Sequence, residues 1–186
     1  MAFKKITLIQ NDITKLEVDV LVNSANKSLL GGGGVDYIIH KKAGVEMQQE
    51  CRRIHDEIGG SLPNGQAVVT MAGNLSAKYL IHTVGPRWLG GSKNEAEELC
   101  NAYLNSLVKA NEIKAKSISF PNISTGVYNY PKLKAAEIAI GTVLSSLPSF
   151  EHIEQVYFVC YDQENYNIYK CILSNLDDPK IQINIV

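Results

Sequence analysis

The chain lacks the long apolar run that a membrane span or the core of a signal peptide requires. Near the N-terminus, Lys4 and Lys5 have no extended hydrophobic stretch behind them, so we expect neither a leader nor a membrane partner. An excess of positive charge is also missing, because 18 basic and 19 acidic residues give a formal net charge of −1. Nucleic acid is therefore not an expected partner, since it requires clustered Lys and Arg.

Metal-binding sequence motifs are missing as well. The 4 cysteines form no C-x-x-C pair, and the 4 histidines include no pair at metal-ligand spacing, so we expect no zinc site. All four cysteines fall within apolar helix or strand patterns: Cys51, Cys100, Cys160 and Cys171. We expect them to be reduced core residues of a cytoplasmic protein.

Three familiar nucleotide-binding and hydrolase motifs fail when tested. A G-x-G-x-x-G motif starting at Gly31 would need a glycine where the chain has Asp36. No glycine run is followed by Gly-Lys-Ser or Gly-Lys-Thr, which excludes a P-loop, and no G-x-S-x-G elbow is present. Any phosphate held by the glycine run would therefore be held by backbone amides without a lysine.

What the sequence does contain is an alternation of short β-rich runs and helical patterns. Apolar and β-branched residues predict strands at 6–9, 18–22, 67–71, 79–84, 117–120 and 156–160. Apolar residues at helical spacing predict helices at 35–43, 47–58, 96–110, 133–147 and 169–176. This alternation indicates an α/β sandwich. The tail 181–185 alternates with period two, and it is either an extra edge strand or merely a sticky terminus.

Unusual residues occupy the loops after four of the predicted strands. In α/β folds, ligands bind beyond the carboxyl ends of the strands, so these loops are predicted to share one site. They comprise Asn11-Asp12, residues 26–36, residues 124–128 and Tyr161-Asp162.

The most informative of these loops contains four consecutive glycines, Gly31 to Gly34. Glycine loses more backbone freedom on folding than any other residue, so such a run indicates a close approach of backbone or ligand. A helix opening at Val35 would also direct free N–H groups at an anion. The alternative is a flexible surface turn.

A second loop, residues 121–131, lies between a predicted strand and a predicted helix. Ser124, Thr125 and Gly126 can turn successive N–H groups toward one point and form an anion nest. Taken alone, the loop could equally be a turn capped by Ser and Thr. Together with the glycine run, it favours a site that holds a diphosphate from two sides.

These motifs together resemble the macrodomain family, and within it the MacroD-type branch. The matching segments are 11–14, 22–26, 31–36, 82–86, 123–128 and 159–166, and the resemblance extends from about residue 6 to residue 176. It implies a three-layer α/β/α sandwich around a mixed, mostly parallel sheet, as one domain over 1–186 with a tail at 177–186. It also implies an ADP-ribose-binding enzyme that removes mono-ADP-ribose from Glu and Asp side chains of proteins and deacetylates O-acetyl-ADP-ribose.

The resemblance also assigns roles to individual residues. Asp12 would accept a hydrogen bond from the adenine amino group, the Ile13 amide would meet the ring, and Tyr161 would stack on it. The phosphates would be held by Gly33, Gly34 and Val35 on one side and by Ser124, Thr125, Gly126 and Val127 on the other, with Ala25 as a further substrate contact.

At the distal ribose, the resemblance places Tyr128 across the sugar and Asn26 on its hydroxyls. Asp36 would position or activate a water molecule beside the anomeric carbon. Without the resemblance, Asp36 would be interpreted as a helix-capping acid and Asn26 as a turn residue. Three asparagines depart from the family pattern, in which Asn11 and Asn129 are usually glycine and Asn122 is a smaller residue. Since Asn tolerates positive φ, we expect the chain to accommodate Asn11 and Asn129.

A single acid suffices for hydrolysis if the leaving group is a carboxylate, whose parent acid has a pKa of about 4. We therefore expect selectivity for ADP-ribose on Glu or Asp over arginine-linked adducts, with no metal and no cofactor. Two other functions stay open, a non-catalytic ADP-ribose reader and an ADP-ribose 1″-phosphate phosphatase. We expect a monomer.

Overall fold

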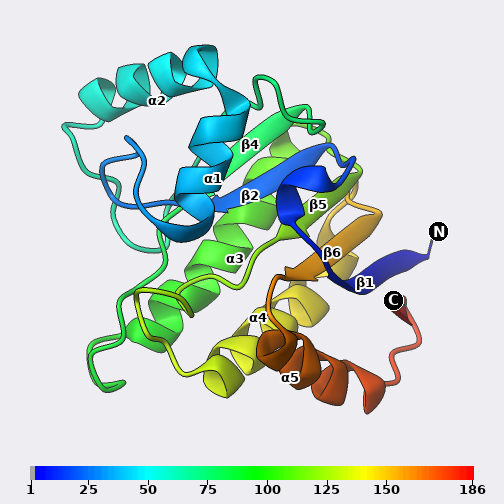
Figure 1. Ribbon diagram of the computed structural model, residues 1–186. Helices are drawn as coiled ribbons and strands as arrows, with labels where there is room; N and C mark the ends of the chain where they lie inside the picture. The colour runs from blue at the N-terminus through cyan, green and yellow to red at the C-terminus, as the bar shows by residue number, and fades with distance from the viewer. Residues whose placement is uncertain (1–2) are drawn as a thin grey trace.

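The computed structural model describes residues 3–186 (Figure 1). Its seven strands form one sheet in the order β3-β4-β2-β5-β6-β1-β7. In chain order the strands are β1 (Lys4–Gln10), β2 (Val20–Ser24), β3 (Ala67–Met71), β4 (Tyr79–Thr83), β5 (Ser117–Phe120), β6 (Gln155–Cys160) and β7 (Ile181–Ile185). Only β3 pairs antiparallel to its neighbour, so the sheet is mixed and mostly parallel.

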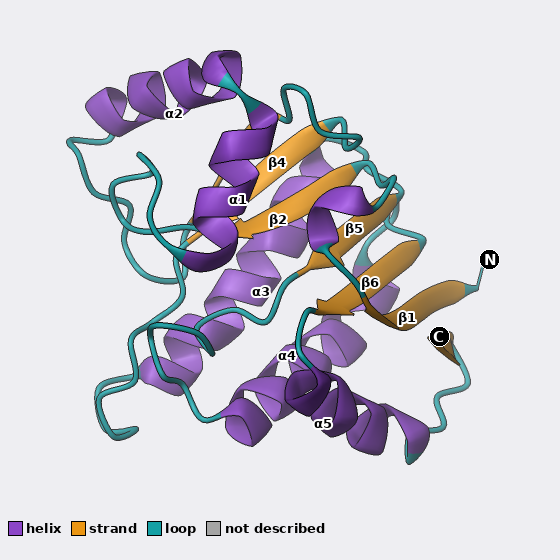
Figure 2. Ribbon diagram, in the orientation of Figure 1, coloured by secondary structure: helices purple, strands orange, loops and turns teal. Residues whose placement is uncertain are grey.

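Five helices cover the two faces of this sheet (Figure 2). One face carries α1 (Gly34–Ala43) and α2 (Val45–Glu57), and the other carries α3 (Glu95–Glu112), α4 (Lys132–Ser146) and α5 (Gln163–Ser174). Short 3₁₀ turns follow β1 at Ile13–Lys15 and α4 at Leu147–Ser149. The three-layer α/β/α sandwich expected from the sequence is confirmed.

Five of the strands, β1, β2, β3, β4 and β6, supply side chains to two separate cores because alternate residues of a strand face opposite sides. On β2, Val20 and Val22 pack with α3 and α4, whereas Leu21 packs with α1 and α2. On β6, Phe158 and Val159 divide in the same way. This two-sided burial explains why the strands read as nearly continuous apolar runs in the sequence.

The structure departs from the sequence expectations in two places, the start of the last helix and the burial of the cysteines, and it decides the conformation of the tail, which the sequence left open. The last helix begins at Gln163 rather than at 169, because the Asp162 carboxylate accepts the Asn165 N–H as an N-cap, at 2.8 Å. Cys51 and Cys160 are buried, but Cys100 is half-buried and Cys171 is exposed, so the expectation of four core cysteines is wrong. The tail forms β7, which pairs parallel to β1 at the edge of the sheet.

No helix within residues 3–186 is long and apolar enough to cross a membrane.

Candidate functional site

The loops singled out in the sequence all follow the carboxyl ends of parallel strands that neighbour one another in the sheet. Asp12 follows β1, Asn26 follows β2, Ser124 follows β5 and Tyr161 follows β6. Because β2, β5, β6 and β1 are consecutive in the strand order, these four loops lie side by side at the C-terminal ends of the strands. The fold thus brings these loops to the same end of the sheet.

Asp36 is held by a buried asparagine that the sequence-based prediction did not include. Asp36 lies in the first turn of α1 and is 3% exposed. The Asn23 side chain, at the end of β2, donates its Nδ2–H to Asp36 Oδ1 at 2.8 Å. Asp36 Oδ2 is buried without a hydrogen-bond partner among the described residues. One carboxylate oxygen is therefore fixed, and the other keeps an unused acceptor position beneath the glycine run.

The hydrogen bonds continue from Asn23 into the interior of the sheet. Asn23 Nδ2 lies 3.1 Å from His82 Nδ1, and His82 Nε2 lies 2.8 Å from Thr70 Oγ1. Thr70 Oγ1 in turn donates to the Met71 carbonyl at 3.1 Å. Since Asn23 Nδ2 can only donate, Nδ1 of His82 must accept and its Nε2 must carry the proton. Burial, and next the nearby His40, lower the pKa of His82 to about 4, so the ring is neutral at pH 7.

A cysteine and a second histidine also lie close to Asp36. The ligating atoms of His40, Cys51 and His82 lie within 4.8 Å of one another, and all three residues are buried. His40 Nε2 is 3.3 Å from Asp36 Oδ1 but lacks hydrogen-bond geometry. Burial, followed by the charges of Asp36 and Glu50, raises the pKa of the Cys51 thiol to about 12. Sequence spacing could not find this cluster, because the residues come from α1, α2 and β4. Both His82 ring nitrogens already have protein partners, so we interpret the cluster as a polar part of the core.

The glycine run lies directly over the two proposed catalytic side chains. Asn26 donates its Nδ2–H to the Gly31 carbonyl at 2.7 Å, and its Oδ1 accepts from Ser28 Oγ at 2.9 Å. A Cβ added to Gly32 would lie 3.1 Å from Asp36 Oδ2 and 3.2 Å from Asn26 Nδ2. A side chain at Gly32 would therefore crowd both groups, which explains the close backbone approach expected from the sequence.

The other two glycines of the run leave space in front of the α1 N-terminus. A Cβ added to Gly33 or Gly34 would meet nothing within 4 Å. Gly33 is the N-cap residue of α1 and provides no side-chain cap, so the first N–H groups of the helix, including that of Val35, are free to bind an anion.

The loop after β5, which the sequence predicts to form an anion nest, contains a residue with a left-handed backbone. Ser124 adopts φ +67°, which is uncommon for a residue with a side chain, and its buried Oγ has no hydrogen-bond partner among the described residues. Thr125 and Tyr128 are half-buried, whereas Gly126 and Val127 are exposed. The Ser124 hydroxyl therefore has an unused hydrogen-bonding capacity at this loop, whereas the Thr125 N–H donates within it, to the Asn122 carbonyl at 3.5 Å.

Two of the three unusual asparagines have clear structural roles in this loop. Asn129 adopts φ +54°, so the prediction that it tolerates positive φ is confirmed. Asn122 donates its side-chain amide to Cys160 Sγ at 3.4 Å, which connects the loop to the end of β6. Asn11 is not among the residues with positive φ, and its Oδ1 accepts the Asp12 N–H at 2.8 Å instead.

At the proposed adenine end, Asp12 already has several partners. Its carboxylate accepts from Thr14 N at 3.0 Å and Thr14 Oγ1 at 2.6 Å, and it pairs with Lys42 Nζ at 2.9 Å. Burial would raise the pKa of Asp12, but these hydrogen bonds outweigh it and the pKa is lowered. Tyr161 is 81% exposed, which leaves its ring face free for stacking.

Two predicted contacts are buried. Ile13 is 5% exposed and belongs to the core under α1 and α2. Ala25 is 3% exposed, and its N–H already donates to the Thr83 carbonyl at 2.9 Å. Ala25 therefore fixes the end of β2 against β4 and has no free N–H to offer.

Fold and site together define the class of this protein. A family model for the Macro domain matches residues 22–139, so the chain belongs to the Macro domain family, and the resemblance drawn from its motifs is confirmed. The chain is 65% identical over 182 residues to a Macro domain-containing protein of Acinetobacter sp. (strain ED45-25), covering 98% of this chain and 99% of that protein. It is 50% identical over 174 residues to the O-acetyl-ADP-ribose deacetylase of Escherichia coli (strain K12), covering 94% and 98%.

Solved structures show the same similarity. The macrodomain of Oceanobacillus iheyensis with ADP matches with a TM-score of 0.85 and 41% identity, covering 90% of this chain and 88% of that one. The macrodomain of Trypanosoma brucei in complex with ADP-ribose matches with a TM-score of 0.81 and 34% identity, covering 90% and 68%.

Proposed function

We propose that this protein is a hydrolase that binds ADP-ribose, deacetylates O-acetyl-ADP-ribose and removes mono-ADP-ribose from Glu and Asp side chains. The observation that carries this proposal is the Asp36 carboxylate, which is buried, fixed through Oδ1 by Asn23 and free at Oδ2. A protein that only binds ADP-ribose has no need for an oriented acid at that place. The deacetylase names of relatives that match over nearly the whole chain support the same activity.

In this proposal, backbone amides hold the diphosphate. The free N–H groups at the start of α1 bind one phosphate, and the loop at Ser124 binds the other. Tyr161 stacks on the adenine, and Asp12 accepts from its amino group while it keeps Thr14 and Lys42 as partners. Tyr128 covers the distal ribose, whose hydroxyls bind Asn26.

The reaction proposed here needs one oriented carboxylate. Asp36 Oδ2 orients a water molecule and takes a proton from it as the water oxygen bonds to the anomeric carbon of the distal ribose. The bond from that carbon to the ester oxygen breaks, and the pair of electrons leaves with a carboxylate: acetate from O-acetyl-ADP-ribose, or the Glu or Asp side chain of a modified protein. Because the parent acids have pKa values of about 4, the leaving group departs without protonation. Positioning of the water supplies most of the acceleration. An arginine-linked adduct has a far poorer leaving group, so we expect little release from it.

Replacing Asp36 with alanine tests the proposal. We expect release of acetate and of ADP-ribose from glutamate-linked substrate to fall by at least about 100-fold, as typically follows the loss of a general base. The affinity for ADP-ribose, measured by calorimetry, should stay within a few-fold, because the diphosphate and adenine contacts remain. A thermal melt of the variant controls for the Asn23 amide that loses its partner.

Three other results would overturn the proposal. Wild-type protein that binds ADP-ribose but turns over neither substrate would be a reader. Faster release of phosphate from ADP-ribose 1″-phosphate than of acetate would identify a phosphatase. Rapid release from arginine-linked substrate would contradict the leaving-group argument.

A further inference from the structure

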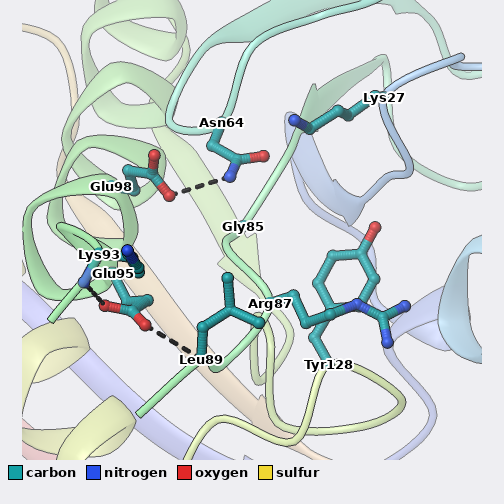
Figure 3. A pocket seen from close by; sticks show the side chains of 9 residues that line it. All are labelled: Lys27, Asn64, Gly85, Arg87, Leu89, Lys93, Glu95, Glu98 and Tyr128. Carbon is teal, nitrogen blue, oxygen red and sulfur yellow. Dashed lines mark hydrogen bonds between the residues drawn. The ribbon is translucent and has the colours of Figure 1, made fainter. Parts of the chain in front are cut away.

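A cavity of about 310 Å³ lies next to the proposed distal-ribose position, on the side of Tyr128 that faces the loops after β4 (Figure 3). Tyr128 contributes to both sites, and its carbonyl accepts the Trp88 N–H at 2.9 Å. Lys27, which directly follows Asn26, extends into the cavity from the opposite wall (Figure 3). The cavity thus begins where the proposed ADP-ribose site ends. The lining residues are Lys27, Asn64, Gly85, Arg87, Leu89, Lys93, Glu95, Glu98 and Tyr128.

The three basic side chains of this cavity have no acidic partner among residues 3–186. Lys27, Arg87 and Lys93 take part in none of the ion pairs of that region. Arg87 instead lies with its guanidinium carbon 5.2 Å from the centre of the Tyr128 ring. Of the 15 Lys and Arg side chains elsewhere in residues 3–186, six pair with carboxylates and nine do not, so the distinguishing feature of the cavity is that three unpaired cations lie together. The cavity therefore gathers cations that the protein itself does not neutralise.

The two acidic side chains of the cavity, in contrast, accept hydrogen bonds from residues that line it or lie next to it. Glu95 is 1% exposed, and its carboxylate accepts the N–H groups of Leu89, Gly91 and Lys93 at 3.0, 3.2 and 2.8 Å. Burial would raise the pKa of Glu95, but these backbone donors outweigh it and lower the pKa. Glu98 accepts from Asn64 Nδ2 at 2.9 Å.

These contacts also give the cavity a defined shape. By gathering three N–H groups onto one buried carboxylate, Glu95 fixes the 89–93 loop that presents Lys93 and the 61% exposed Leu89 at the rim. Lys93 therefore lies on a fixed loop, beside the apolar Leu89 side chain.

We propose that this cavity binds the polypeptide of the modified substrate protein, through acidic residues that flank the ADP-ribosylated Glu or Asp. This inference rests on the function proposed above, because it extends that site on the side where the leaving group departs. Charge complementarity selects an acidic peptide: three uncompensated cations meet carboxylates, and Leu89 contacts the peptide backbone or an apolar neighbour. Nucleic acid fits the cavity poorly, since the chain as a whole carries a net charge of −1.

Paired substrates test the proposal. One peptide carries a glutamate-linked ADP-ribose flanked by aspartates, and its partner carries asparagines at the same positions. We expect kcat/KM for the acidic peptide to exceed that for the neutral one by about tenfold at low ionic strength, and the difference to shrink in high salt. O-acetyl-ADP-ribose, which has no peptide, is the internal reference.

The variants Lys27→Gln and Lys93→Gln, singly and together, should reduce this preference by a few-fold each through KM, as expected for partly exposed ion pairs. The rate with O-acetyl-ADP-ribose should not change. The matched control is Lys170→Gln, which removes the same charge from an exposed position on α5, far along the chain from the cavity. Arg87 is left intact because it contacts Tyr128.

The proposal is overturned if wild-type protein treats the two peptides alike, or if the double variant keeps the preference. It is also overturned if Lys170→Gln reduces the preference as much as Lys27→Gln, or if a single-stranded RNA competes as well as the acidic peptide. If no substrate is turned over, the proposed function fails. The inference is then decided by calorimetry, which compares the affinities of the two intact modified peptides for wild type and double variant.

Discussion

Replacing Thr70 with valine tests how the interior of the sheet controls Asp36. Thr70 is 1% exposed, and its Oγ1 is the acceptor for the His82 Nε2–H at 2.8 Å. Valine has nearly the same shape but no oxygen. The variant therefore leaves a buried N–H on His82 without an acceptor, because the nearest alternative, Cys51 Sγ, lies 3.7 Å away and accepts only weakly.

Two effects follow from this single change. An unsatisfied buried donor costs about 1–3 kcal/mol, so the free energy of unfolding should fall by that amount. The neutral ring would also lose the reason to keep its proton on Nε2. With the proton on Nδ1, the ring would face the Asn23 amide donor to donor, and the amide would turn its oxygen toward Asp36. Losing a hydrogen bond to a charged group costs about 1.5–3 kcal/mol, which corresponds to about 10- to 150-fold in kcat.

The assay combines steady-state release of acetate, calorimetry with ADP-ribose and urea unfolding. We expect kcat to fall while the affinity for ADP-ribose stays the same, and Thr70→Ser should restore the rate. Thr142→Val is the matched control, because Thr142 is also buried but lies on α4 and donates to the Ile138 carbonyl. A folded Thr70→Val protein with wild-type kcat would refute the argument, and so would an equal loss of kcat in Thr142→Val.

Three further predictions concern pH, packing and stacking. Because the pKa of His82 is about 4 when folded and about 6.5 in the unfolded chain, protons bind the unfolded state preferentially between these values. The His82 contribution to the free energy of unfolding is about 3 kcal/mol. It should be complete above pH 6.5 and disappear as the pH falls toward 4. An NMR titration that shows the folded His82 ring ionising near pH 6.5 would contradict this. Gly85→Ala should lower the free energy of unfolding in urea by about 1–3 kcal/mol. The added Cβ would lie 2.5 Å from Ile123 Cγ2 and closer still to Ser124 Oγ. An unchanged unfolding midpoint would show that the loop at Ile123 and Ser124 moves aside without cost. Tyr161→Ala should weaken ADP-ribose binding about 5- to 150-fold in calorimetry, and unchanged affinity would mean that the exposed ring does not stack on adenine.

The layers of the fold and the meeting of the four unusual loops were predictable because they depend on local patterns. Nearly continuous apolar runs, separated by helical patterns, define strands such as β2 and β6. Loops after parallel strands must lie at the same end of the sheet. The conformation of Asn129 was also predictable, since few residue types tolerate positive φ.

The support of the site was not predictable, because it depends on contacts between distant segments. Asn23, Thr70 and His82 occupy ordinary strand positions, and only the pairing of β2 and β3 with β4 brings them together. The early start of α5 depends on one capping bond from Asp162. The cavity beside Tyr128 depends on the 89–93 loop, which Glu95 holds through three backbone N–H groups, and no sequence motif predicts these contacts.

The Gly31 carbonyl competes with a ligand for one N–H of the Asn26 side-chain amide, because it already accepts that N–H. A molecule that takes the same N–H must first displace that carbonyl, so its measured affinity is the intrinsic affinity scaled by the fraction of molecules in which this hydrogen bond is open. Because Gly31 to Gly34 have no side chains, the Gly31 carbonyl can turn away from Asn26 without repacking of neighbouring side chains. A nucleotide that ends at the diphosphate would leave the hydrogen bond between Asn26 and Gly31 intact, whereas a ligand whose terminal sugar takes that N–H would have to break it.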